Sequence, residues 1–173
     1  TFVAAVALYK SLNKICGSNH NLKLKWPNDI LLNGKKCCGI LLESKMLKAG
    51  NYVVIGIGVN CQDFPSQTLH EATSLKTEGI DVTAEDAFEF IAQDVATVID
   101  LWCRGEGFQA VRNLWLENAY GLGEEVTIRI LGQDDKCGIF TSIDEAGYML
   151  LETSDKKIQR ISTADIFFNR SIT

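Results

Sequence analysis

The stretch that decides the fold is LKLKWPNDILLNGKKCCGILLESK, residues 22–45. Leucine and lysine alternate from its start to Trp26, which is the period of a β-strand with one apolar and one cationic face. Pro27 and the Asn-Asp pair after it end that strand, because proline restricts the preceding residue to extended backbone. Asn33-Gly34 between two apolar runs is typical of a tight hairpin turn. The pattern predicts strands over Leu22–Trp26, Ile30–Leu32 and Cys38–Lys45.

Helices and one more strand are predicted on either side of this stretch. Apolar residues share one helical stripe over residues 2–16, and Gly17 follows as a natural stop. Thr83 and Asp86 form a capping-box variant that opens a helix extending to about Cys103. A strand is expected over Tyr52–Asn60 and a short helix over Phe108–Asn118. Apolar residues at helical spacing in the longer helix are expected in the core: Phe88, Ile91, Val95, Val98, Ile99 and Trp102.

The pattern changes after Gly121 and Gly123, where short strands replace helices. Short strands at close spacing predict a small barrel of about 45 residues. We therefore predict an α+β protein with one domain at residues 1–120 and a second at residues 121–173. The strands of the second domain are expected at Val126–Leu131, Cys137–Ile143, Tyr148–Glu152 and Lys157–Ile161.

Composition excludes several protein classes. With 46% apolar residues, 23% charged residues and 2 Pro, the 173 residues have the composition of a folded protein. No apolar stretch approaches the roughly 20 residues of a membrane helix, and no signal-peptide pattern opens the chain, so we expect no membrane partner. The six cysteines contain no C-x-x-C pair, and the chain is long enough to bury a core. We therefore expect free thiols in a reducing, cytoplasmic compartment.

Positive charge is concentrated near the start of the chain. Residues 1–50 contain eight lysines and two acidic residues, a local charge of +6 in a chain whose net charge is −5. This distribution indicates either a solvated lysine face or a local anion site. Nucleic-acid binding is not favoured, because the basic stretch lacks interleaved aromatic residues and no DNA-binding motif accompanies it.

The most specific motif is K-W-P-N-D, residues 25–29. It places the Lys25 ammonium group at a strand end and the Asp29 carboxylate beyond a rigid turn. A cation beside a carboxylate suits a phosphate with its metal ion, because lysine screens phosphate oxygens and aspartate binds Mg²⁺. For this motif alone, a surface ion pair at a turn is the stronger alternative.

Two further motifs follow in the next strands. Lys36 lies beyond the hairpin turn and can approach the same ligand as Lys25, and Gly39 permits backbone contact with that ligand. The run G-I-G-V-N, residues 56–60, places two glycines in a buried strand, which would admit a flat ring, and ends in an amide that can read a base edge. Taken alone, a bulge or close packing explains these glycines better.

In combination, K-W-P-N-D, K-x-x-G-I-L and G-I-G-V-N at these separations resemble the biotin protein ligases, which include the holocarboxylase synthetases. The resemblance covers essentially the whole chain. It implies a class II synthetase-like mixed β-sheet with helices, present in part, followed by a small SH3-like β-barrel. It also implies an enzyme that makes biotinyl-5'-AMP from biotin and Mg-ATP. Such an enzyme then transfers biotin to a lysine of the biotin-carrier domain of a carboxylase.

The same resemblance implies roles for single residues. Lys25 and Asp29 are expected at the nucleotide phosphates and Mg²⁺, and Lys36 at the biotin carboxylate or the acyl phosphate; these three form the catalytic group. Gly39 is expected to line the biotin pocket. Gly56, Gly58 and Asn60 are expected to border the adenine, with a hydrogen bond from Asn60. In the terminal barrel, Asp165 matches a carboxylate that approaches the nucleotide in the family, and Asn169 stands in place of an arginine.

The family's Gly-Arg-Gly-x-x-Gly-Arg-x-Trp loop is absent from these residues. We therefore expect the sequence to belong to a longer protein, and we expect the isolated chain neither to adenylate biotin nor to bind it tightly. Two alternatives stay open, a lipoate or other acyl-protein ligase and a non-catalytic binding module. The oligomeric state is open too, a homodimer included.

Overall fold

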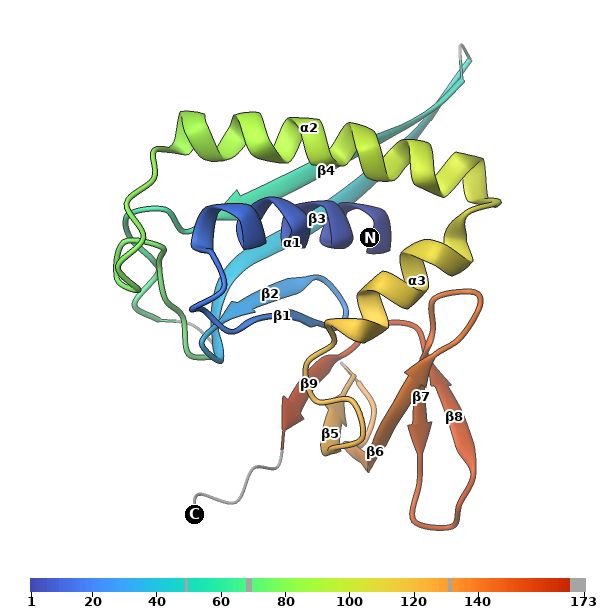
Figure 1. Cartoon of the computed structure of the whole chain (residues 1–173). Coiled ribbons are helices and arrows are strands. Elements are labelled where there is room, and N and C mark those ends of the chain that lie inside the picture. The colour runs from blue at the N-terminus through green and yellow to red at the C-terminus, as the bar shows by residue number, and fades with distance from the viewer. Residues whose placement is uncertain (49, 68–69, 131, 169–173) are drawn as a thin grey trace.

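A four-stranded antiparallel sheet contains the stretch quoted above (Figure 1). The computed structural model describes residues 1–48, 50–67, 70–130 and 132–168. The strands lie in chain order across the sheet: β1 (Leu22–Lys25), β2 (Asp29–Leu32), β3 (Lys35–Leu47) and β4 (Gly50–Val59). Asn33 and Gly34 form the turn between β2 and β3 with positive φ angles of 51° and 84°, as the Asn-Gly pair predicts. The expected hairpin is confirmed.

The register of this sheet aligns the three sequence motifs in a single row. Lys25 pairs with Asp29, Asp29 pairs with Gly39, and Gly39 pairs with Gly58. Side chains opposite one another on neighbouring strands point to the same face of a sheet. The row therefore presents Lys25 and Asp29 on one face, with open backbone at the two glycines beside them.

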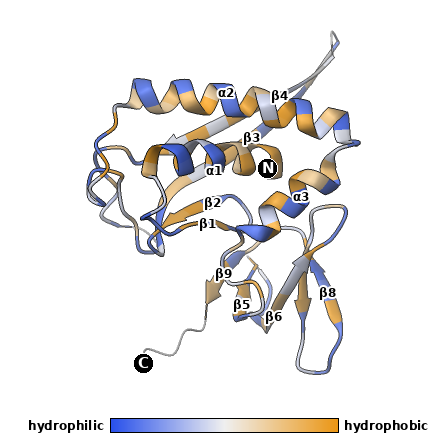
Figure 2. Cartoon of the chain, in the orientation of Figure 1, coloured by the Kyte–Doolittle hydropathy of each residue, from blue (hydrophilic) through white to orange (hydrophobic). Residues whose placement is uncertain are grey.

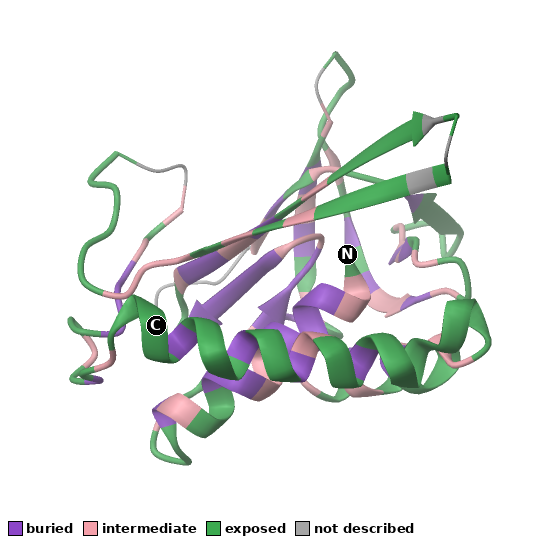
Figure 3. Ribbon diagram, turned by 90° about the horizontal axis from the view of Figure 1, so that it is seen from above, coloured by how far each residue is buried: buried purple, intermediate pink, exposed green. Residues whose placement is uncertain are grey.

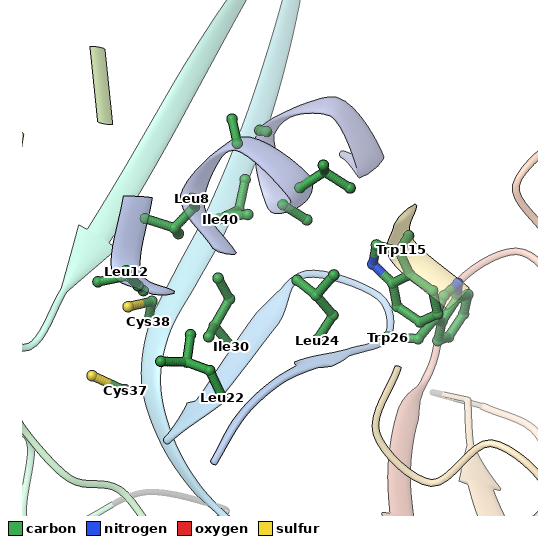
Figure 4. Packing of buried hydrophobic residues seen from close by; sticks show 14 of the residues in the cluster. Leu8, Leu12, Leu22, Leu24, Trp26, Ile30, Cys37, Cys38, Ile40 and Trp115 are labelled. Atoms are coloured by element: carbon green, nitrogen blue, oxygen red, sulfur yellow. The ribbon is translucent and has the colours of Figure 1, made fainter. Parts of the chain in front are cut away.

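A β-bulge at Cys37 brings Lys36 to this same face. Ile30 pairs with Cys38, whereas Leu31 pairs with Lys36, so Cys37 is the extra residue on β3. Without the bulge, Lys36 and Gly39 would face opposite sides of the strand, because their separation is an odd number of residues. Figure 4 shows the Cys37 and Cys38 thiols on the same side of β3, and both residues are buried.

The opposite face of the sheet forms the core with the helices. α1 (Phe2–Cys16) packs against β1, β2 and α2 (Ala84–Trp102), and Figure 4 shows Leu8 and Leu12 facing Ile30 and Ile40. Lys14 and Ser11 of α1 donate hydrogen bonds of 2.7 to 2.8 Å to the buried carboxylate of Asp94 on α2. These bonds satisfy a charge that would otherwise be costly to bury, and so fix one helix on the other.

The expectation that the whole apolar set of α2 is buried is wrong in part. Thr83 caps the helix as expected, with Oγ1 accepting a hydrogen bond from the Asp86 N–H. Ile91 and Val98 are buried, but Phe88, Ile99 and Trp102 are exposed. Apolar residues continue along α2 (Figure 2), while much of the helix surface is exposed (Figure 3). The exposed residues lie roughly 80° around the helix from the stripe that contacts α1, at 100° per residue.

A second sheet of five antiparallel strands follows α3 (Phe108–Glu117), which comes after a short 3-10 turn (Cys103–Gly105). The spatial order is β8-β7-β6-β5-β9, with all neighbours antiparallel. No pairing between β8 and β9 closes it within the described residues, so the expected barrel is an open sheet there. The first sheet was expected to be mixed, but the ladders between its four strands are all antiparallel in the described part of the chain. The strands are β5 (Glu125–Arg129), β6 (Lys136–Ile143), β7 (Met149–Glu152), β8 (Ile158–Ile161) and β9 (Asp165–Phe168).

Helix α3 connects the second sheet to the rest of the molecule. Trp115 is buried. Its ring centroid lies 5.4 Å from that of Phe2 on α1 and 6.4 Å from that of Phe140 on β6. Arg112 donates a hydrogen bond of 2.7 Å from Nε to the carbonyl of Ile143. Gly121 follows with φ 70°, and a Cβ there would lie 1.8 Å from the Phe168 ring, so only glycine fits. The Leu24 N–H donates to the Asn118 carbonyl at 2.9 Å and the Tyr120 N–H donates to the Leu24 carbonyl at 2.8 Å, which holds the segment before the second sheet against β1 beside Lys25.

Candidate functional site

A cleft of about 750 Å³ lies where the two sheets meet. The first sheet contributes the β1–β2 turn and the start of β3, and the second sheet contributes β5 and β9. The loop between β4 and α2 supplies a further wall. The charged or ionisable residues that line the cleft are Lys25, Asp29, Lys36, His70, Arg129 and Asp165. The structure thus brings together cations and carboxylates from five separate segments of the chain.

Lys25 is a buried lysine at the end of β1, only 6% exposed. Burial lowers the pKa of its ammonium group below the ordinary value of 10.5; Asp29 opposes this effect and Lys36 reinforces it. No ion pair within the described part of the chain joins Lys25 to a carboxylate. A buried ammonium without such a partner destabilises the fold, which makes Lys25 a candidate for binding an anionic ligand.

Asp29 and Lys36 form an ion pair beside Lys25. Lys36 Nζ lies 2.6 Å from Asp29 Oδ1, and Asp29 is 8% exposed. The contact is short, but its direction does not suit a hydrogen bond, so within the described residues Asp29 Oδ1 is buried without a hydrogen-bond partner. This oxygen can therefore accept a metal ion or a donor group of a ligand.

The turn between β1 and β2 is fixed by hydrogen bonds to β3. Asn28 donates from Nδ2 to the Ile40 carbonyl at 2.8 Å, and the Ile40 N–H donates to the Asn28 carbonyl at 2.9 Å. Pro27 supplies a rigid φ within the same turn. Lys25 and Asp29, which flank the turn, are thereby positioned relative to the strand that carries Lys36 and Gly39.

Gly39 lies beside the ion pair, next to the cleft. A Cβ added to Gly39 would lie 3.5 Å from Lys36 Cε and 3.6 Å from Asp29 Oδ1, which are ordinary contact distances. One on Gly56 would lie 3.4 Å from the Leu41 carbonyl, and one on Gly58 3.9 Å from the Gly39 carbonyl. Packing within the described residues therefore does not require glycine at these positions.

Asn60 forms hydrogen bonds to the loop between β4 and α2 and does not line the cleft. Its Nδ2 donates to the Thr73 carbonyl at 2.9 Å, and its carbonyl accepts from the Leu75 N–H at 2.8 Å. Its own N–H donates to the Cys37 carbonyl at 2.9 Å. Gly56 and Gly58 are also outside the cleft lining. Asn169 lies outside the described residues.

Two residues of the cleft were not found from the sequence. His70 comes from the loop after β4, and Arg129 comes from the end of β5. Burial lowers the pKa of His70, and Lys25 adds to that effect. Neither residue belongs to a motif, and each reaches the cleft only because of contacts between distant segments. Asp165, which the sequence did indicate, lines the cleft beside them.

Replacing Lys25 with methionine is expected to raise the free energy of unfolding by about 1 kcal/mol, because methionine fills similar volume without a buried charge. The pKa of Lys25 is lower in the folded chain than in the unfolded chain. At pH values between these two pKa values, Lys25 therefore carries a proton in the unfolded chain and has lost it in the folded chain. The Lys25 contribution to stability therefore increases as pH rises through that window towards 10.5. Urea unfolding at several pH values should show this increase in the wild type and its loss in Lys25→Met. A Lys25→Met protein less stable than wild type would contradict the account.

Comparison with known proteins adds to this geometry. The sequence profile of the "Biotin/lipoate A/B protein ligase family" matches residues 1–117, and that of the "Biotin protein ligase C terminal domain" matches residues 121–169. The biotin--[acetyl-CoA-carboxylase] ligase of Paracoccus denitrificans is 38% identical over 175 residues, covering 97% of this chain and 72% of the relative. A bifunctional ligase/repressor of Bacillus subtilis is 34% identical, covering 96% of the chain and 51% of the relative.

The fold has solved counterparts as well. The structure of a biotin protein ligase from Aquifex aeolicus in complex with biotin and ATP matches with a TM-score of 0.78. That match covers 98% of this chain and 70% of the other, at 24% sequence identity. The fold of this chain is therefore similar to that of the matched part of that ligase.

Proposed function

The chain belongs to the biotin protein ligase family, and from this premise we propose that its cleft binds Mg-ATP and the carboxylate of biotin. The proposed reaction forms biotinyl-5'-AMP and then transfers biotin to a lysine of a biotin-carrier domain of a carboxylase. The observation that carries the proposal is the buried Lys25 beside the Asp29–Lys36 pair, because these charges lack full compensation from the described residues. Two relatives named as biotin--[acetyl-CoA-carboxylase] ligases, at 38% and 30% identity, favour biotin over lipoate.

The chemistry we propose is electrostatic positioning without a covalent enzyme intermediate. A carboxylate and a triphosphate repel each other, so bringing them to reacting distance requires cations on both. Lys25 and Lys36 lie on the same face of the sheet and can each neutralise one of the two anions. The biotin carboxylate oxygen then attacks the α-phosphate, and pyrophosphate leaves.

Asp29 fits the role of the Mg²⁺ ligand. Its buried Oδ1 has no hydrogen-bond partner within the described residues, and carboxylate oxygen is the ligand type that Mg²⁺ prefers. The described residues contain no cluster of three or more His, Cys, Asp or Glu side chains suited to a metal. Mg²⁺ commonly binds through one or two carboxylates together with substrate phosphates, so one protein carboxylate is compatible with this chemistry. The ion would supply charge neutralisation at the phosphates.

Asp29 is also proposed to act in the second half-reaction. The acceptor lysine must be a neutral amine in order to attack the mixed anhydride, and a carboxylate beside the acyl group can accept or orient its proton. AMP is the leaving group of that step.

The arrangement of the chain supports further proposals. We assign residues 1–120 to the catalytic part and residues 121–173 to the second domain, in agreement with the separate ranges of the two family matches. All six cysteines are free thiols, which supports a reducing, cytoplasmic setting. None of the described helices is long and apolar enough to span a membrane.

The test is biotin- and ATP-dependent labelling of a purified biotin-carrier domain by the full-length protein. Labelling that requires both substrates and the target lysine of the carrier is the expected result. If the folded protein labels the carrier with lipoate and ATP but not with biotin, the acyl-ligase alternative replaces the proposal. No labelling with either acid would indicate a non-catalytic binding module.

Replacing Gly39 with alanine is expected to raise the KM for biotin about tenfold, because a methyl group would occupy the space of a ligand against the backbone. The substitution should leave the melting temperature unchanged, since the added Cβ has ordinary contacts. Gly58 lies outside the cleft lining and is expected at the adenine from the family resemblance alone, so Gly58→Ala tests that expectation through a rise in the KM for ATP. Steady-state kinetics with each substrate varied separately checks both. Unchanged KM values for both substrates in Gly39→Ala would remove Gly39 from the biotin site.

A further inference from the structure

Arg129 faces the catalytic lysines from the second sheet. It ends β5 and lines the same cleft as Lys25, Asp29 and Lys36. Its cross-strand partner on β9 is Asp165, which lines the cleft too. The wall opposite the first sheet therefore offers one cation and one carboxylate side by side.

The guanidinium group of Arg129 is held in position by two contacts. Nε lies 3.1 Å from Asp135 Oδ1 and Nη2 lies 2.9 Å from Asp135 Oδ2, the two-point geometry of an arginine–carboxylate pair. The carbon at the centre of the group lies 4.7 Å from the centroid of the Phe167 ring. These contacts hold the side chain at the cleft although it is 53% exposed.

Donors remain on this side chain for a ligand. A guanidinium group has five N–H donors, and the contacts to Asp135 use Nε and Nη2 only. Because planar N–H pairs match phosphate oxygens, arginine suits a phosphate chain better than lysine does. An anion in the cleft would also be repelled by Asp165, and a neighbouring cation offsets that repulsion.

We propose that Arg129 binds the phosphate chain of the nucleoside triphosphate, as a substrate-binding residue contributed by the second sheet. The inference rests on the proposed function, since it names a further residue for the same nucleotide. Arg129 is assigned to ATP alone and not to biotin.

The chain offers a matched control in Arg160. Arg160 is 56% exposed, its Nε lies 2.6 Å from Asp144 Oδ2, and its guanidinium lies 4.3 Å from the centroid of the Tyr148 ring. It thus has the same kinds of contact, in the same sheet, as Arg129. It does not line the cleft. A general effect of removing a paired surface arginine would appear equally in both variants.

The experiment measures KM for ATP and KM for biotin separately in the full-length wild type, Arg129→Gln and Arg160→Gln. Arg129→Gln should raise the KM for ATP about tenfold, the loss of one charge-assisted contact. Its KM for biotin and its melting temperature should stay within twofold and about 2 °C of wild type, and Arg160→Gln should match wild type throughout. Arg129→Lys keeps the charge and should show an intermediate KM for ATP.

The outcomes separate this inference from the proposed function. An active wild type whose KM for ATP is unchanged in Arg129→Gln overturns the role of Arg129 and leaves the ligase proposal in place. An equal rise in Arg160→Gln also overturns it, because the effect would then be general. Should Arg129→Gln not fold, Arg129→Lys decides the question by the same KM comparison. A wild type without biotin- and ATP-dependent labelling rejects the proposed function itself.

Discussion

Replacing Lys36 with methionine in the full-length protein is expected to lower the rate of biotinyl-5'-AMP formation about a hundredfold, the usual effect of losing one preorganised charge at a reacting centre. Lys36 Nζ lies 2.6 Å from Asp29 Oδ1 and shares the sheet face of Lys25. Without it, one of the two reacting anions loses its cation. Single-turnover adenylate formation, measured at saturating biotin and ATP, checks the rate.

Stability must be separated from catalysis in this variant. Lys36→Met leaves the buried Asp29 carboxylate without its ion-pair partner, which is expected to destabilise the fold by about 1–3 kcal/mol. The double variant Lys36→Met, Asp29→Asn removes both charges and should recover most of that stability without recovering activity. Lys35→Met is the control for loss of a lysine from the same strand, because Lys35 does not line the cleft. Adenylation within threefold of wild type in a folded Lys36→Met protein would exclude the assigned role.

Replacing Asp29 with asparagine is expected to lower adenylate formation about a hundredfold, because an amide binds Mg²⁺ and compensates the lysines far less well than a carboxylate. The variant should also need a higher Mg²⁺ concentration for half-maximal rate. Asparagine keeps the shape of the side chain but removes the charge that compensates Lys25 and Lys36, so the free energy of unfolding should fall by about 1–3 kcal/mol and rates are compared where both proteins are folded. Asp81→Asn, at an exposed position outside the cleft, serves as the control.

Supplying preformed biotinyl-5'-AMP separates the two roles assigned to Asp29. This reagent bypasses the step that needs Mg²⁺ and ATP, so only biotin transfer to the carrier lysine is measured. If Asp29 accepts or orients the proton of the amine, transfer by Asp29→Asn should fall about a hundredfold, the lower end of the usual range for loss of a positioned general base. Near-normal transfer would reject that second role while leaving the first role intact.

Much of the catalytic face was predictable because it is built by local chain geometry. Alternation over Leu22–Trp26, the Asn33-Gly34 turn and the Thr83 cap each depend on residues close together in sequence, and each is confirmed. Adjacent strands of a hairpin bring their residues close together, so Lys25 and Asp29 lie near Lys36, as expected.

Contacts between residues far apart in the sequence determined features that the sequence patterns could not predict. The bulge at Cys37 determines which face of the sheet Lys36 occupies, and the spacing of residues in the sequence does not predict this bulge. Helical periodicity gave the apolar face of α2, but contact with α1 determined that Val98 is buried and Phe88 is exposed. Periodicity shows which residues share a face, whereas burial depends on what packs against that face.

The amino-acid sequence by itself determined most of the strand and helix segments, the row of motif residues and the family. It did not predict β9 (Asp165–Phe168), the strand that carries Asp165. Only the tertiary structure placed Arg129 and His70 in the cleft beside Asp165, opened the second sheet between β8 and β9 in its described part, and assigned Asn60 to bracing a loop. The physical reason is that hairpins and caps are specified by neighbouring residues, whose short separation makes their contacts entropically cheap. The cleft forms only when α3 and its buried Trp115 dock one sheet against the other, which is a property of the whole chain.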